Sequence, residues 1–143
     1  MHERDVVILG AGMSGLCCAA QLRRAGIENF VVVEQSPGLG GTWWDNRYPG
    51  AQVDVPAPLY SFSFAPNPRW QRRFAAAAEI QAYMQRVAED QGVLPHCRFG
   101  ERIESAVFDE AAARWQVRTD RGNAWAARHL VLSTGPLSRP RLP

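Results

Sequence analysis

Three glycines and one acidic residue near the start of the chain have the types and spacing needed to bind a dinucleotide. Gly10, Gly12 and Gly15 fit the pattern G-x-G-x-x-G, and Glu34 follows at about the expected twenty-residue interval. The first glycine permits a tight turn, the second leaves room for a pyrophosphate, and the third lets helix and strand pack closely. A helix starting near Ser14 would direct unpaired N–H groups at the phosphates. These residues predict adenine dinucleotide binding, with Glu34 accepting hydrogen bonds from ribose hydroxyls.

We call the three glycines Gly10, Gly12 and Gly15 the cradle. The elements that must position them are visible in the sequence on either side. Residues 5–9 are an apolar, β-branched run typical of a buried strand, residues 14–25 have helical spacing, and residues 30–33 predict a second buried strand. Because Glu34 closes the second strand, the three segments predict a βαβ unit. No Arg lies near Glu34 in the sequence to hold a 2′-phosphate, which disfavours NADP at this first site.

A long loop, residues 36–68, follows the βαβ unit and is rich in proline, glycine and aromatic residues. A loop of this length in a small domain is usually functional or disordered, and its aromatic content favours an ordered, functional loop. Gly40–Gly41 would allow a second close backbone approach to a ligand. Trp43 and Tyr60 could cover a planar ring, although ordinary core packing explains such aromatics equally well.

The rest of the chain predicts one helix and five strands. We expect the helix at 79–90, a short strand at 97–99, an antiparallel meander at 101–109, 114–119 and 124–128, and a last buried strand at 129–133. A plain NAD dehydrogenase would usually continue with another β-α unit, so this order favours FAD over NAD. We therefore predict an α/β fold: a Rossmann-like FAD-binding domain with a parallel sheet and an antiparallel β-meander, as in glutathione reductase, truncated.

The composition excludes several other function classes. A length of 143 residues suits one domain, and a net charge of +2 gives no electrostatic case for nucleic acid or anionic lipid. No apolar run reaches the roughly 18 residues that a membrane span needs. The three cysteines lack the spacing of metal ligands, so we expect no metal, and free thiols in a reducing, cytoplasmic compartment.

Two further segments carry a resemblance to a known family. GGTWWDNRYPGAQVD at residues 40–54, followed by YSFSF at 60–64, resembles the segment typical of Baeyer–Villiger monooxygenases. The terminal STGPLSRPRLP at residues 133–143 is similar to the ATG-type motif of the same family. Ser133 replaces the Ala of that motif, and residues 55–58 contain two prolines where relatives often carry Glu or Ser. With the cradle included, the resemblance covers nearly the whole chain.

The resemblance implies roles for the residues at matching positions. It assigns FAD contacts to the cradle glycines, Ser14 and Glu34, and to a set in the loop and strand ends: Gly41, Thr42, Trp43, Trp44, Asp45, Tyr60, Ile103, Thr134 and Gly135. It also places Gln52, Val53 and Asp54 near the nicotinamide of NADPH. Asp54 is the implied catalytic residue, acting beside the flavin with an Arg from a second nucleotide domain.

The resemblance also implies an activity: NADPH reduces the flavin, and the reduced flavin uses O₂ to oxidise a ketone to an ester or lactone. Residues 1–143 would be the N-terminal FAD-binding domain, without the NADPH and substrate domains. We therefore expect FAD binding without NADPH-driven turnover, and we hypothesise self-association through uncovered apolar surface. Two alternatives stay open: an N-hydroxylating or dimethylaniline-type flavin monooxygenase, which generally lacks the RYPG run, and a stand-alone dinucleotide-binding module.

Overall fold

Six strands form one mixed sheet in the computed structural model, which describes residues 1–138, 141 and 142. Arg139, Pro140 and Pro143 of the terminal motif lie outside the described residues. The strand order is β3-β2-β1-β6-β5-β4. The bounds are β1 His2–Leu9, β2 Phe30–Glu34, β3 Cys97–Phe99, β4 Ile103–Asp109, β5 Arg114–Thr119 and β6 Ala124–Leu132. Strands β3, β2, β1 and β6 run parallel, and β6, β5 and β4 are antiparallel. The predicted Rossmann-like α/β fold with a meander is confirmed.

The strand β6 corrects one expectation. Residues 124–128 and 129–133 were expected as a meander strand and a separate buried strand, but they form one continuous strand that ends at Leu132. It pairs with β5 only as far as Ala127, whereas its pairing with β1 continues to Leu132. Beyond Ala127 the strand loses its neighbour on one edge, and Leu132 is 68% exposed. The prediction of a separate, buried last strand was therefore wrong.

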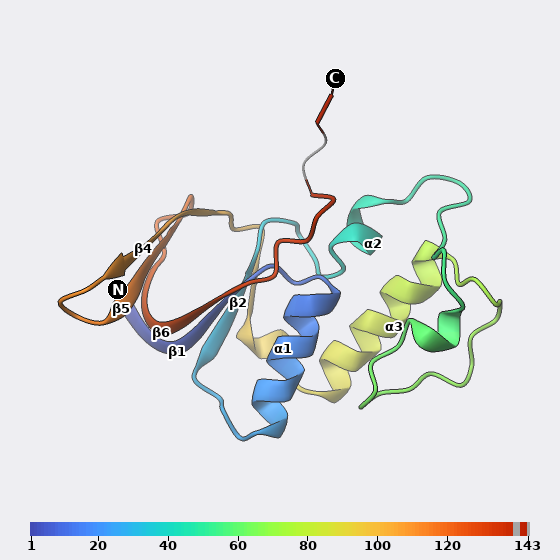
Figure 1. Ribbon diagram of the computed structural model, residues 1–143, viewed down its shortest axis with the longest axis horizontal. Helices are drawn as coiled ribbons and strands as arrows, with labels where there is room; N and C mark the ends of the chain where they lie inside the picture. The colour runs from blue at the N-terminus through green and yellow to red at the C-terminus, as the bar shows by residue number, and fades with distance from the viewer. Residues whose placement is uncertain (139–140, 143) are drawn as a thin grey trace.

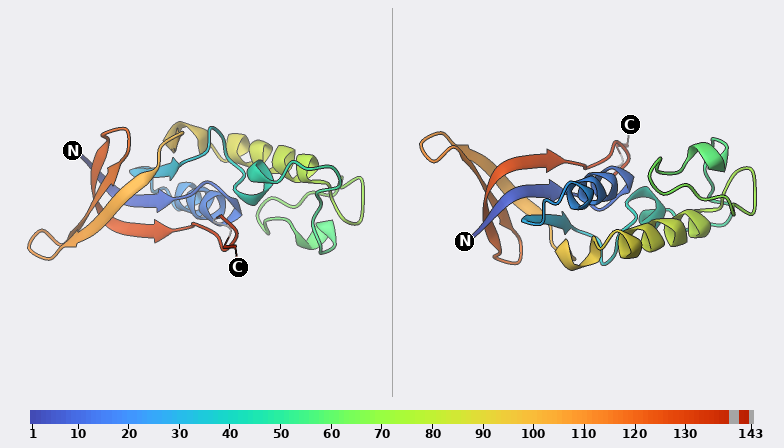
Figure 2. Two further views of the ribbon diagram at one scale, coloured as in Figure 1. Left: turned by 90° about the horizontal axis from the view of Figure 1, so that it is seen from above. Right: turned by 90° about the horizontal axis from the view of Figure 1, so that it is seen from below.

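The helices lie together beside the sheet, away from the meander. The two long ones are α1 (Met13–Arg24) and α3 (Ala77–Asp90), and the short ones are α2 (Thr42–Asp45), η1 (Ala57–Leu59) and η2 (Leu94–His96). Figure 1 shows α3 and the 46–76 loop at one end of the molecule and the β4–β5 hairpin at the other. Figure 2 shows the twist by which β4 and β5 cross the parallel strands. No helix in the described part of the chain is long and apolar enough to cross a membrane.

Two hydrophobic cores lie on opposite faces of the sheet. Because successive side chains of a strand point to opposite faces, Val6 and Ile8 of β1 pack against the helices while Val7 joins the core under the meander. The helix-side core includes Ile80 and Met84 of α3, both fully buried. These cores fix the parallel strands from both sides, and so they fix the loops that leave the strands' carboxyl ends.

Candidate functional site

A cavity of ≈ 530 Å³ opens at the carboxyl ends of β1, β2 and β6. Ligands of open α/β sheets bind at this edge, where the loops diverge. Twelve of the residues predicted from the sequence line the cavity: Gly10, Gly12, Ser14, Glu34, Gly41, Thr42, Trp43, Asp45, Tyr60, Ile103, Thr134 and Gly135. The fold thus brings together, in one space, residues from six separate stretches of the chain.

The three cradle glycines have different structural roles. A Cβ on Gly10, whose φ is +104°, would collide with the carbonyl oxygen of Ser133, and a Cβ on Gly15 would collide with that of Gly10. These two positions are needed for close packing inside the fold. At Gly12 a Cβ would meet nothing nearer than the Cα of Gly41, at 3.6 Å. The packing of the fold therefore does not require glycine at position 12. The missing side chain of Gly12 instead leaves space in the cavity.

The first turn of α1 is available to an anion. Gly12 is the N-cap residue, and among the described residues no side chain caps the helix and no acidic residue stands in its first turn. The first N–H groups of an α-helix lack intrahelical partners and carry a partial positive charge. Because Gly12, Met13 and Ser14 also line the cavity, these groups offer a site for phosphate oxygens.

Glu34 is the buried acidic residue of the cavity. Its side chain ends β2, and the residue is only 6% exposed. One carboxylate oxygen accepts a hydrogen bond from the N–H of Ala11 at 2.8 Å, and the other accepts one from the N–H of Ser36 at 2.7 Å. Each oxygen keeps a second lone pair, so the carboxylate is held in place yet still able to accept from two hydroxyls.

Trp43 and Tyr60 form an aromatic pair at the cavity. The indole N–H of Trp43 donates to the hydroxyl oxygen of Tyr60 at 3.0 Å, and their rings meet edge to face with centroids 5.7 Å apart. Trp43 follows the Gly40–Gly41 turn, whose glycines have φ values of +138° and +54°. Both φ values favour glycine, so the turn that presents Trp43 depends on these two residues.

The loop that carries Tyr60 is anchored to α3 through Tyr83. The hydroxyl of Tyr83 accepts a hydrogen bond from the N–H of Phe62 at 2.8 Å and donates one to the carbonyl of Ala65 at 2.7 Å. Burial raises the pKa of the Tyr83 hydroxyl above its ordinary value, which keeps it protonated and able to donate. The long loop is therefore ordered against the core, as its aromatic content predicted.

Five predicted residues lie outside the cavity lining. Gly15 packs against the carbonyl of Gly10, and Trp44 packs against Gly38 with the guanidinium of Arg47 4.1 Å above its ring. Val53 is buried in the helix-side core, while Gln52 and Asp54 on either side of it are exposed. The structure thus separates Gln52, Val53 and Asp54 from the cradle, and Gln52 and Asp54 face solvent.

Several cavity residues had not been singled out from the sequence. They include Met13, Gln35, Ser36, Glu101 and Arg102. Arg102 corrects the expectation that no Arg lies near Glu34, which held only along the sequence. The connection between β3 and β4 brings it there, since the N–H of Glu101 donates to the carbonyl of Glu34 at 3.0 Å. No local pattern around residue 102 signals this contact.

A second, larger groove of ≈ 880 Å³ lies along the solvent-facing side of α3. Its lining includes Ala78, Ala82 and three arginines, Arg69, Arg72 and Arg86, but no cradle residue. This groove therefore lacks the residues of a dinucleotide site. Within the described residues, no group of three or more His, Cys, Asp or Glu side chains could hold a metal ion.

Comparisons with known proteins agree with this geometry. Residues 8–77 match the model of the NAD(P)-binding Rossmann-like domain. The chain is 47% identical to a Baeyer–Villiger monooxygenase of Streptomyces coelicolor. The match covers the whole of this chain and 28% of that protein. Its fold matches oxidized steroid monooxygenase bound to NADP with a TM-score of 0.93 and 42% identity, over 99% of this chain and 28% of that one. Over nearly its whole length the chain is thus similar to part of the Baeyer–Villiger-type flavin monooxygenases.

A structure of OTEMO in complex with FAD and NADP is also similar, with a TM-score of 0.90 and 33% identity over 98% of this chain and 27% of that one. The chain therefore spans about 28% of the length of the Baeyer–Villiger-type relatives it matches. The cavity fits the FAD that this family implies, because it has a glycine wall at Gly12, an uncapped helix start and a buried carboxylate at Glu34.

Proposed function

We propose that residues 1–143 form the FAD-binding domain of an NADPH-dependent flavin monooxygenase that oxidises ketones to esters or lactones. The observation that carries the proposal is one continuous cavity that contains the helix start at Gly12, the carboxylate of Glu34 and the Trp43–Tyr60 pair. The resemblance to Baeyer–Villiger monooxygenases supports the reaction type. None of the most similar relatives is named as an N-hydroxylating enzyme, so that alternative is not favoured.

Each part of the cavity would hold one part of FAD. The N–H groups around Gly12 and Ser14 would bind the pyrophosphate, and Glu34 would accept hydrogen bonds from the adenosine ribose. Thr42, Trp43 and Tyr60 would line the flavin half and keep water from it. FAD itself supplies hydride acceptance from NADPH and the activation of O₂.

The direct test is a titration of the purified chain with FAD, followed by flavin fluorescence and absorbance. We expect binding that saturates at one FAD per chain and strong quenching of the flavin, because Trp43 and Tyr60 would lie close to it. FMN serves as a control, since it lacks the adenosine half. A chain that stays colourless after incubation with excess FAD and gel filtration would contradict the proposed function.

We also propose that this chain binds FAD but does not oxidise NADPH on its own. The chain contains one glycine cradle of the G-x-G-x-x-G type, which we assign to FAD. We therefore expect the 143-residue chain to bind FAD without oxidising NADPH in the presence of ketones. Ketone-dependent NADPH oxidation by this chain alone would contradict the assignment.

Asp54 is proposed to act in catalysis from outside the FAD cavity. Its side chain is exposed, and so is that of Gln52 two residues before it. Such a face is open to a nicotinamide or to a side chain from elsewhere in the enzyme. In an enzyme that contains the complete set of domains, Asp54→Asn is expected to lower kcat and leave the FAD affinity unchanged. An equal loss of FAD affinity would instead show that Asp54 supports the cavity.

Two further properties are proposed from the cysteines and from the exposed apolar side chains. A reducing, cytoplasmic location suits the three cysteines, which are all free. Self-association of the 143-residue chain is suggested by exposed apolar side chains at Leu59, Leu132 and Leu137. Light scattering over a range of concentrations tests the second property, and a constant monomer mass would contradict it.

A further inference from the structure

The segment between β3 and β4 crosses the carboxyl end of β2 and brings a cation to the cavity. Glu101, Arg102 and Ile103 all line the cavity together with Glu34 and Ser36. The segment is bonded to the end of β2 at two points: Gly100 donates to the carbonyl of Ser36 at 2.9 Å, and Glu101 to that of Glu34 at 3.0 Å. Arg102 therefore lies at the same end of the cavity as the carboxylate expected to bind the ribose.

A buried acidic residue makes this segment rigid. Glu101 is 6% exposed, and its carboxylate accepts hydrogen bonds from the hydroxyl of Thr119 at 3.2 Å and from the amide of Asn123 at 2.9 Å. A buried carboxylate without such donors would be strongly unfavourable. Glu101 thus ties the crossing segment to the β5–β6 turn and limits the freedom of its neighbour, Arg102.

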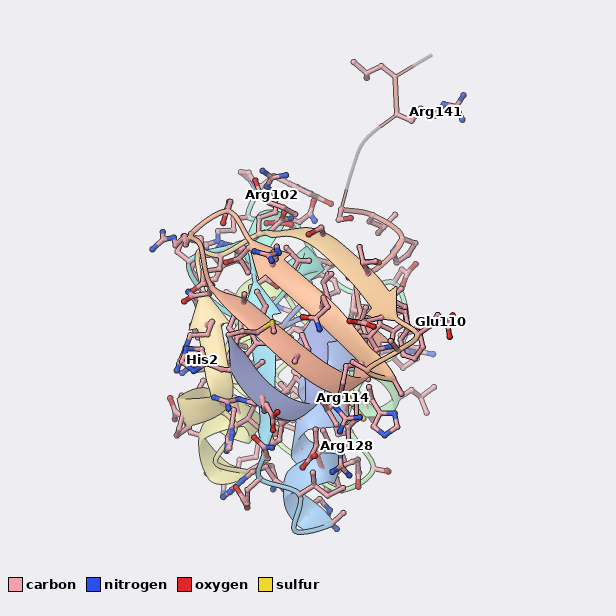
Figure 3. All side chains as sticks on the ribbon, turned by 90° about the vertical axis from the view of Figure 1, so that its left-hand side faces the viewer. His2, Arg102, Glu110, Arg114, Arg128 and Arg141 are labelled. Atoms are coloured by element: carbon pink, nitrogen blue, oxygen red, sulfur yellow. The ribbon has the colours of Figure 1, made fainter. Side chains whose placement is uncertain are left out.

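Arg102 itself is held by Asp120 and Glu104. The backbone N–H of Arg102 donates to Oδ1 of Asp120 at 3.0 Å. The backbone N–H of Asp120 donates to the carbonyl of Arg102, also at 3.0 Å. The guanidinium lies 3.7 Å from Oδ2 of Asp120 through Nε and 3.7 Å from Oε1 of Glu104 through Nη2. Figure 3 shows Arg102 at the upper edge of the sheet, far from Arg114 and Arg128 at its lower edge. Both contacts use N–H groups of the guanidinium, and the side chain of Arg102 stays 52% exposed.

The charges around Arg102 decide what it can bind. Asp120 and Glu104 compensate its positive charge, and the carboxylate of Glu34 faces the same cavity. An additional phosphate on the ribose would meet Glu34, while the cation is already shared between two carboxylates. The guanidinium is therefore poorly suited to a 2′-phosphate. A planar, weakly hydrated and half-exposed guanidinium is well suited to stacking on an aromatic base.

We propose that Arg102 stacks on the adenine of FAD and makes the site selective for the adenine dinucleotide over FMN. The inference rests on the proposed FAD site, in which the pyrophosphate lies at Gly12 and the ribose at Glu34. From the ribose, the base extends away from the pyrophosphate and toward Arg102 and Ile103. Asp120 is then a positioning residue, because it fixes both the backbone and the guanidinium of Arg102.

The test compares three probes on the 143-residue chain by calorimetric titration: FAD, ADP and FMN. Arg102→Ala is expected to raise the Kd of FAD and of ADP by about 2- to 30-fold, the range for a cation stacked on an aromatic ring. The Kd of FMN should not change, because FMN lacks the adenosine half. Arg118→Ala is the matched control, since Arg118 is an exposed arginine of β5 that does not line the cavity.

Arg102→Lys separates stacking from charge. Lys keeps the positive charge but lacks the planar group, so Arg102→Lys should recover at most part of the affinity for FAD and ADP that Arg102→Ala loses. Full rescue by Lys, or a preference of the unmodified chain for 2′,5′-ADP over ADP, would overturn the proposal in favour of an anion site. Equal affinity of the Ala variant and the unmodified chain for ADP would also overturn it. If the unmodified chain binds neither FAD nor ADP, the proposed function itself fails, which is a different outcome.

Discussion

The contrast between Gly12 and Gly15 allows fold and binding to be separated by two single methyl groups. At Gly12 the backbone is extended, with φ −76° and ψ −169°, a conformation open to Ala. The added Cβ would lie 3.6 Å from the Cα of Gly41, an ordinary van der Waals contact. Ala is a poorer N-cap than Gly, so we expect Gly12→Ala to lower the free energy of unfolding by only about 0.5–1 kcal/mol.

Gly15→Ala should behave in the opposite way. Its Cβ would collide with the backbone carbonyl of Gly10, which cannot move without shifting the turn out of β1. Overpacking of this kind costs about 1–3 kcal/mol and occasionally more, and a backbone obstacle places this variant at the upper end. We expect a clear fall in Tm for Gly15→Ala and a fall of at most a few degrees for Gly12→Ala.

The binding assay should reverse this order. The methyl of Gly12→Ala would occupy space beside the first N–H groups of α1, where the pyrophosphate is proposed to lie. A cost of about 1–3 kcal/mol corresponds to a rise in the Kd of FAD of about 5- to 150-fold. The measurement is fluorescence titration at a temperature well below the Tm of both variants. If Gly12→Ala binds FAD as tightly as the unmodified chain, the pyrophosphate is not at Gly12 and the reasoning is refuted.

Three other changes test separate parts of the structure. Glu34→Gln places an amide NH₂ against the N–H of Ala11 or Ser36, so we expect a loss of about 1–3 kcal/mol in chemical unfolding, and unchanged stability would contradict the two bonds. Ala113→Gly relieves a φ of +50° in the β4–β5 turn and should raise the free energy of unfolding by about 0.5–1 kcal/mol, measured by urea denaturation. Burial raises the pKa of Cys97 from 9.0 to about 11, so its contribution to stability is present below pH 9 and is lost as the pH rises through 11. Iodoacetamide at pH 8.5 should leave Cys97 of the folded chain unmodified, and mass spectrometry that finds it alkylated would contradict its burial.

The part of the cavity that could be located from the sequence comes mostly from residues close together in the chain. The cradle and Glu34 follow from spacing within the first βαβ unit, where strand, turn and helix are adjacent and the glycine requirements are local. Thr42, Trp43 and Tyr60 could be assigned to the cavity from the motif that contains them. The fold class followed because buried strands and a meander have different hydrophobic patterns.

Two features could not be predicted because they depend on distant pairing. Arg102 reaches Glu34 only through the hydrogen bond between Glu101 and the end of β2, which joins residues far apart in the sequence. The continuity of β6 was hidden by Arg128 and His129, two adjacent exposed residues that resemble a break between elements. They mark instead the point where the pairing of β6 with β5 stops and one edge of the strand becomes free. In both cases tertiary contacts, rather than local pattern, set the outcome.

The contact between Gly12 and Gly41 has a consequence for anyone who trims or transplants this site. A Cβ on Gly41 would lie 2.9 Å from the Cα of Gly12, so the two backbones touch. A peptide reduced to the first βαβ unit would therefore carry only one side of the cavity at the strand ends. A graft of the glycine loop into another scaffold needs the Gly40–Gly41 turn beside it, supplied either in the same chain or as a complementing second piece.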